Sequence, residues 1–139
     1  MADLTITAAD VRVVKRADEH QMSAPMLEAC TAGQYIRTDP TTGKFRLGNA
    51  TTLTEIGDGF IAEHSRAIGE PNTGLKGPCV LDVGDALSGL DFGASVHLSI
   101  TDGTLADADS GAYGEALVVG TVIPAFGDTT AKKLMRLEL

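Results

Sequence analysis

The side chains that could carry out catalysis are few and are spread along the chain. The histidines stand at positions 20, 64 and 97, and none forms a His-x-His, His-Glu-x-x-His or Cys-x-x-Cys unit with Cys30 or Cys79. Ser65 follows His64 directly, but neighbours on a strand point to opposite sides, and no acidic residue can be placed to complete a catalytic triad. Both cysteines are interpreted as small buried hydrophobic residues. The sequence therefore predicts no catalytic residue and a protein that is not an enzyme.

Two stretches rich in glycine and aspartate have the outline of ligand-binding loops, but neither has the required spacing. Residues 57–62 read Gly-Asp-Gly-Phe-Ile-Ala, as in a dinucleotide-binding fingerprint, yet prolines and glycines between 71 and 78 interrupt the second strand that such a site needs. A calcium loop starting at Asp107 would have Gly111 at a ligand position and Val118 in place of the closing glutamate. Turn glycines and solvated carboxylates explain both stretches, so we expect no cofactor and no metal.

The composition is that of a folded domain and disfavours several kinds of partner. The chain has 139 residues and 43% hydrophobic content, which suffices for one domain with a buried core. Its net charge of −8 disfavours the phosphate backbone as a ligand, and 4% aromatic content without tryptophan offers few surfaces on which bases could stack. No apolar run approaches the length of a membrane span, and the first residues lack the basic start of a signal peptide. We therefore expect no nucleic-acid partner, no membrane span and synthesis in the cytoplasm.

One stretch occurs twice and organises the rest of the chain. Residues 32–50 and 92–110 align without gaps at an offset of 60, so that Gly33 matches Gly93. Each copy has a glycine, a short apolar run, a Thr/Asp/Gly turn and a second short run, which is the pattern of a β-hairpin. We interpret the copies as a duplicated hairpin unit inside one compact domain. With the apolar segments that follow them, the repeats cover about residues 32–62 and 92–120.

Most of the remaining sequence also predicts short strands. Sixteen glycines favour tight turns over long helices. The turn-rich residues 69–74 predict a loop between the two halves. The expected fold is mainly β, a compact barrel or sandwich-like domain over residues 21–139 with little helix. Alternating or near-continuous apolar runs predict strands outside the hairpins at residues 4–7, 25–30, 57–62, 78–83, 116–123 and 134–139.

The N-terminal segment, residues 1–20, lies outside the repeats and is interpreted as an extended arm. Thr7-Ala8-Ala9-Asp10 matches a capping box, which would allow a helix to about His20, but the β-branched residues that follow favour a single turn and then a strand. An exposed strand of this kind can add to the sheet edge of a partner. Packing in the core of the domain is the alternative for the same side chains. The apolar residues predicted to contact the partner are Leu4, Ile6, Val11, Val13 and Val14.

Five segments taken together resemble one known family. They are Ala2 to Val11, Thr31 to Gln34, Thr42 to Lys44, Leu47 to Ala50 and Ser99 to Gly103. These turn and strand motifs are similar to those of small head-decoration (capsid cement) proteins of tailed bacteriophages. The resemblance covers most of the chain, although residues 22–28 and the loop around Pro71 depart from the pattern.

The resemblance implies a β-rich structural virion protein that binds the outer surface of a phage capsid and stabilises it by bridging capsid subunits. The implied partners are the major capsid protein and further copies of the chain, commonly as a homotrimer, with the N-terminal segment reaching onto the capsid protein. The protein would then lie on the capsid exterior of the virion after synthesis in the host cytoplasm. The alternatives are another structural phage component, such as a tail or head–tail protein, and a small ligand-binding β module, which the scarcity of aromatic residues disfavours.

Overall fold

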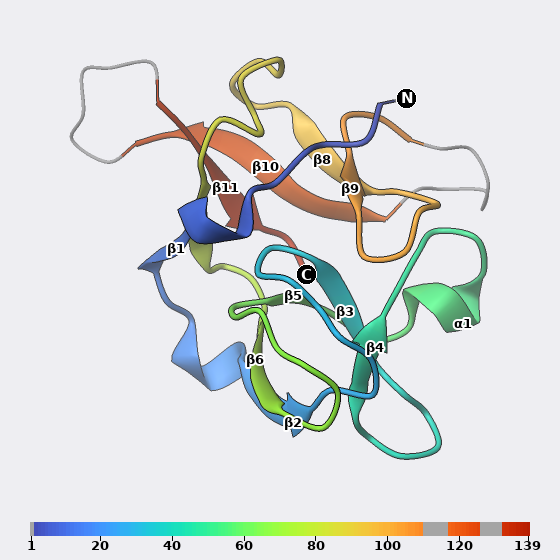
Figure 1. Cartoon of the computed structure of the whole chain (residues 1–139). Helices are drawn as coiled ribbons and strands as arrows, with labels where there is room; N and C mark the ends of the chain where they lie inside the picture. The colour runs from blue at the N-terminus through green and yellow to red at the C-terminus, as the bar shows by residue number, and fades with distance from the viewer. Residues whose placement is uncertain (1, 110–116, 126–131) are drawn as a thin grey trace.

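Two antiparallel β-sheets make up the fold, and the computed structural model describes residues 2–109, 117–125 and 132–139. The strands of the larger sheet are β1 (Val11–Lys15), β7 (Val80–Val83), β8 (Ser95–Leu98), β9 (Leu105–Ala106), β10 (Val118–Pro124) and β11 (Lys133–Leu137). Those of the smaller sheet are β2 (Met22–Pro25), β3 (Tyr35–Thr38), β4 (Phe45–Leu47), β5 (Gly59–Ala62) and β6 (Pro71–Leu75). The strand orders are β1-β7-β11-β10-β8-β9 and β2-β6-β5-β3-β4, and the sheets pack in a sandwich-like arrangement (Figure 1).

In the described part of the chain, helix is confined to three short pieces. In α1 (Leu53–Ile56), a single turn, the hydroxyl of the N-cap Thr52 accepts a hydrogen bond from the Glu55 amide at 3.1 Å. The others are the 3₁₀ turns η1 (Ala8–Asp10) and η2 (Asp18–His20). The prediction of a mainly β fold with little helix is confirmed. Neither sheet closes into a barrel, so the sandwich-like form of that prediction is the one the structure adopts.

The same five-strand arrangement occurs twice. In the first unit, residues 22–75, the strand order is β2-β6-β5-β3-β4, and in the second unit, residues 80–137, it is β7-β11-β10-β8-β9. In chain order, β2 corresponds to β7, β3 to β8, β4 to β9, β5 to β10 and β6 to β11. β1 is an addition to the second unit, paired with β7. The two predicted hairpins therefore lie at equivalent places in two units that share one strand order over all five strands.

Backbone hydrogen bonds repeat at the offset of 60 that the sequence shows. The amide of Gly33 donates to the carbonyl of Ala62 at 2.9 Å, and the amide of Gly93 donates to the carbonyl of Val122 at 2.8 Å. The two glycines have φ values of 90° and 86°, a left-handed conformation that other residues adopt only at a cost. The two hairpins therefore begin from the same backbone geometry, and that geometry is why glycine starts each of them.

Two apolar clusters stabilise the fold. The smaller one lies on one face of the smaller sheet, where the rings of Phe45 and Phe60 have centroids 5.3 Å apart. Because the opposite face of that sheet packs on the larger sheet, all four residues of β5 are buried. The larger cluster combines side chains of both sheets, among them Tyr35, Ile61, Leu75, Leu81, Val83, Val96, Leu98, Val122, Met135 and Leu137.

The loop predicted at residues 69–74 is wrong, because β6 begins there and is an interior strand of the smaller sheet. Pro71 is the first residue of β6, a position where a missing N–H is tolerated. Gly74 allows close packing, since a Cβ at this position would lie 2.8 Å from Cγ of Phe60. Residues that usually form turns therefore serve here to start a strand and to admit an aromatic ring.

Two shorter predicted strands also need correction. The strand predicted at residues 25–30 lies earlier, as β2 at Met22–Pro25. Residues 4–7 form no strand, and the neighbouring Asp3 makes only an isolated bridge to Ala106. The single turn followed by a strand is confirmed as η1 and β1. The predicted strand at 116–123 corresponds to β10, although residue 116 lies outside the described residues.

We predict that alanine has unequal effects at the two equivalent glycines. Nothing lies within 4 Å of a Cβ added at Gly93, so Gly93→Ala should cost only the left-handed backbone penalty of about 1–2 kcal/mol. At Gly33 the same atom would lie 2.8 Å from Cγ2 of Ile6, so Gly33→Ala should cost at least about 1 kcal/mol more through overpacking. Urea unfolding of both variants measures the difference, and equal losses would contradict the packing of Ile6 on this turn.

Candidate functional site

Sheet edges are the places where a β protein can pair with an extended segment of a partner. The strands at the ends of the two sheets are β1 and β9 in the larger sheet and β2 and β4 in the smaller one. We therefore compared what lies against the outer side of each of these edges.

The outer side of β4 is covered by the chain that follows β2. Met26 forms an isolated bridge with Phe45, and the amide of Leu27 donates to the carbonyl of Phe45 at 2.7 Å. The carboxylate of Glu28 accepts from the amide of Leu47 at 3.2 Å. These contacts occupy the backbone groups that a partner strand would need.

The outer side of β9 is covered by the first residues of the chain. The amide of Leu4 donates to the carbonyl of Leu105 at 2.8 Å, and the amide of Asp107 donates to the carbonyl of Ala2 at 3.0 Å. We name residues 2–6, which cross this edge, the N-terminal strap. The strap closes the β9 edge as residues 26–28 close the β4 edge.

β2 is protected by its composition. Pro25 ends the strand opposite Pro71 of β6, and it has no N–H to donate to an added strand. Proline at an edge is a common protection against unwanted strand pairing.

β1 is the remaining edge, and among the described residues no strand lies against its outer side. Arg12, Val14 and Lys15 are exposed, with Val14 at 44%. The pairing with β7 shifts register between Val13 and Lys15, which leaves Val14 without a partner residue on β7. The β1 edge, residues 11–15, is therefore the candidate site, a strand with an exposed valine between two cationic side chains.

The structure separates the five predicted contact residues into two groups. Val11, Val13 and Val14 lie together on β1, where Val14 is exposed and Val13 packs partly buried against the larger cluster. Leu4 and Ile6 lie in the strap and are also packed partly buried against that cluster. The contact role stays a prediction for all five, and only the first group lies on an open edge.

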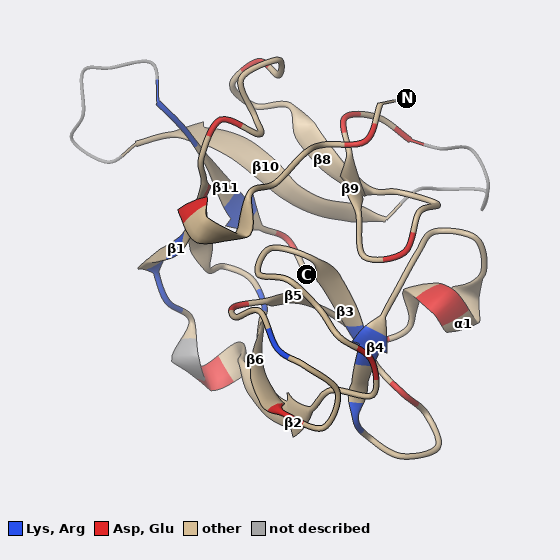
Figure 2. Cartoon of the chain, viewed as in Figure 1, with Lys and Arg blue, Asp and Glu red and all other residues tan. Residues whose placement is uncertain are grey.

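Basic residues gather near the β1 edge although the whole chain is acidic. Arg12 and Lys15 lie on β1, and Lys133 and Arg136 lie on β11, with β7 between these two strands (Figure 2). Acidic groups accompany them, since the carboxylate of Asp82 on β7 lies 3.1 Å from Nζ of Lys132. Asp10, Asp82 and Asp85 line one pocket with Arg12 and Lys132, so the cations of this part of the sheet stand beside carboxylates and do not make it basic.

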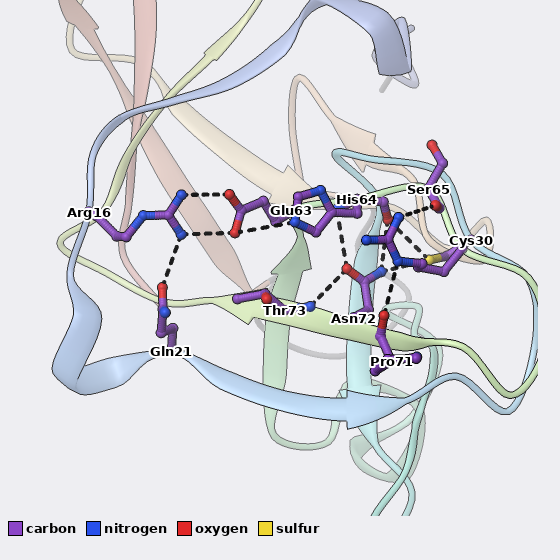
Figure 3. Close-up of polar contacts among 10 residues, drawn as sticks. Arg16, Gln21, Cys30, Glu63, His64, Ser65, Pro71, Asn72 and Thr73 are labelled. Atoms are coloured by element: carbon purple, nitrogen blue, oxygen red, sulfur yellow. Dashed lines mark hydrogen bonds and ion pairs between the residues drawn. The ribbon is translucent and has the colours of Figure 1, made fainter.

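A bidentate ion pair fixes the end of β1 to the smaller sheet. The guanidinium of Arg16 lies 2.8 Å and 2.6 Å from the two carboxylate oxygens of Glu63, and it also donates to the side chain of Gln21 at 3.2 Å (Figure 3). The hydrogen bond from Arg16 lowers the pKa of the Glu63 carboxyl. Sequence reasoning missed this pair because its partners lie 47 residues apart, and no local spacing signals it.

Cysteine, histidine and asparagine meet near Glu63, but their geometry is structural. The side-chain amide of Asn72 donates to Sγ of Cys30 at 3.1 Å and to the backbone carbonyl of His64 at 2.8 Å (Figure 3). The imidazole of His64 lies instead near Glu63, with Nε2 3.8 Å from its carboxylate. Burial raises the pKa of the Cys30 thiol, which disfavours the reactive thiolate. Cys30 and Cys79 are both buried, and neither forms a disulfide among the described residues.

Of the two stretches with the outline of ligand loops, residues 57–62 can be followed in full, whereas residues 110–116 of the loop outlined from Asp107 lie outside the described residues. Gly57 follows α1 and residues 59–62 form β5, so the helix that a dinucleotide site needs is replaced by a strand. Asp102 accepts from the side-chain amide of Asn49 at 2.6 Å, and Asp107 accepts from the amide of Ala2 at 2.8 Å. Over residues 2–109, 117–125 and 132–139, no group of three or more His, Cys, Asp and Glu side chains is placed to hold a metal ion.

Comparison with known protein families, with curated proteins and with solved structures found no match to this chain. Within the part that the structure describes, no helix is both long and apolar enough to cross a membrane.

We predict that the Arg16–Glu63 pair makes stability fall in mild acid. Because the folded-state pKa of Glu63 is lowered, its contribution is present above the unfolded-state pKa of about 4.3 and is lost as pH falls through the folded-state value. In Glu63→Gln this part of the pH dependence should be missing. Urea midpoints measured from neutral pH to about pH 3, below the ordinary pKa, test this, and parallel curves for the two proteins would contradict it.

Proposed function

We propose that this protein is a structural component of a tailed-phage virion that binds the outer surface of the capsid through its β1 edge. The observation that supports the proposal best is the contrast among the sheet edges: three are closed or protected by the chain itself, and β1 is open among the described residues. An open edge offers main-chain hydrogen bonds to an extended segment, and side chains on either face add selectivity. The motifs similar to capsid cement proteins support the major capsid protein as the partner.

Binding at this edge would extend the larger sheet by a strand from a capsid subunit. A copy that also touches the neighbouring subunit clamps the two together, and this role needs no catalytic residue and no cofactor. Copies arranged as a homotrimer would repeat the contact around an axis, and a regular array sums contacts that are individually modest. In this proposal the protein lies on the virion exterior and contacts neither nucleic acid nor membrane.

We predict that a charge at Val14 abolishes capsid binding. Val14→Asp replaces the exposed apolar side chain of this edge with a carboxylate, which loses its hydration when a partner strand covers the edge, and that desolvation is costly. Ile68→Asp is the matched control, because Ile68 is 71% exposed and lies between β5 and β6, away from β1. Both side chains are exposed, so both variants should keep their unfolding free energy within about 0.5 kcal/mol.

The measurement is co-sedimentation with capsids assembled from a tailed-phage major capsid protein encoded in the same genome, with electron microscopy of the pellets. We expect saturable binding of the unaltered protein and of Ile68→Asp to expanded capsids, little binding to immature ones, and at least about tenfold weaker binding of Val14→Asp, equivalent to about 1.4 kcal/mol. Failure of the unaltered protein to bind expanded capsids would contradict the function. Equal binding of both variants would contradict the β1 edge as the contact.

A further inference from the structure

In each unit, a backbone carbonyl on the edge strand β4 or β9 accepts a hydrogen bond from a segment outside the sheet. The carbonyl of Phe45 on β4 accepts from the amide of Leu27 at 2.7 Å, and the carbonyl of Leu105 on β9 accepts from the amide of Leu4 at 2.8 Å. Phe45 and Leu105 are equivalent at the offset of 60. Each unit therefore binds an extended segment of the chain along the outer edge of its last strand, β4 or β9.

The two positions are filled from different sources. Leu27 follows β2 directly, so the first unit closes its own edge. In the second unit the chain after β7 turns away, with tight turns closed by the amides of Ser88 and Leu90 donating to Asp85 and Leu87 at 3.1 Å and 3.0 Å. The second unit is consequently closed by the strap, a segment from outside the unit.

The polar contacts of the strap are concentrated on the β8–β9 hairpin. The carboxylate of Asp3 accepts from Oγ of Ser99 at 2.5 Å and from Oγ1 of Thr101 at 3.1 Å. The amide of Ala2 donates to the carboxylate of Asp107 at 2.8 Å. An extended segment of the same sequence from another molecule can make each of these contacts, because the hairpin supplies every partner group.

A pocket borders the strap, and a single short turn joins the strap to β1. A cavity of about 320 Å³ lies among the strap, the turn at residues 31–34 and residues 103–105. Between the strap and β1 the chain makes only the η1 turn, in which the amide of Asp10 donates to the carbonyl of Thr7 at 2.9 Å. Opening one short turn would let the strap leave its own hairpin while β1 stays paired with β7.

We propose that the strap of one copy occupies the β9 edge of a second copy, so that copies are linked by exchange of residues 2–6. The contacts formed between molecules are the same as those broken within each molecule, so exchange changes little contact energy, and a rising protein concentration shifts the balance from closure within one molecule to links between molecules. The second copy thereby contributes Asp3 and Leu4 to the edge of the first. This exchange does not depend on capsid binding, since it uses the β9 edge and not the β1 edge.

The test uses cysteine pairs in the full-length protein. Asp3→Cys and Thr101→Cys are prepared separately, on chains of different mass, because the two native side chains lie 3.1 Å apart and the native cysteines are buried. The two chains are mixed, oxidised and analysed by non-reducing electrophoresis and by mass spectrometry of linked peptides. We expect a disulfide that joins position 3 of one chain to position 101 of the other, increasing with protein concentration. The control is a mixture of Asp3→Cys with Ile68→Cys. Its yield of linked product should be at least about tenfold lower than that of the first mixture, which corresponds to about 1.4 kcal/mol.

A second measurement uses the unaltered chain. It tests the exchange even if the cysteine substitutions disturb folding. Isotopically labelled and unlabelled copies are mixed, and filtered nuclear Overhauser spectra should show contacts between Leu4 of one copy and Leu105 of another. Finding only intramolecular contacts and no link between chains, up to the highest soluble concentration, would overturn the exchange. Neither measurement involves capsids, so exchange and capsid binding can fail independently.

Discussion

The need to satisfy backbone hydrogen-bonding groups at sheet edges is the constraint on which the structure depends. A strand at the end of a sheet has N–H and C=O groups directed outward, and these groups are either paired, covered or left as a place for another strand. Here β4 is covered by residues 26–28, β9 by the strap, and β2 ends in Pro25. The two segments that cover these edges, residues 26–28 and the strap, belong to no strand of either sheet.

Duplication explains why one molecule solves the same problem in two ways. Both units have the same strand order and the same glycine geometry at Gly33 and Gly93, so each must close an equivalent edge. The first unit uses the chain just after β2, whereas the turns after β7 take the second unit's chain elsewhere. The N-terminal segment fills the vacated position and then continues as β1 against β7. The strap and β1 therefore follow from the difference between the units, not from their similarity.

The hairpins could be predicted from the sequence because their information is local. Gly33 and Gly93 have positive φ, and glycine-rich turns between alternating runs indicate hairpins without reference to the rest of the fold. β6 could not be predicted in this way, because Pro71 and Gly74 resemble a loop until Pro25 and the Phe60 ring lie beside them. The candidate site was predicted in part: the valines of β1 follow from their β-branched pattern, but the openness of this edge depends on what covers the other three. The Arg16–Glu63 pair, which joins distant segments, had no local signal at all.

The way β1 is held bears on its suitability for binding. Its first residue follows the η1 turn, and its end is fixed by the bidentate contact of Arg16 with Glu63, whose side chain is 15% exposed. Pairing with β7 fixes the strand between these points. An edge that is already extended and ordered loses little conformational entropy when a partner strand is added, so more of the interaction free energy remains as affinity. The order of β1 thus favours the same edge that stays open when β4 and β9 are covered and β2 ends in proline.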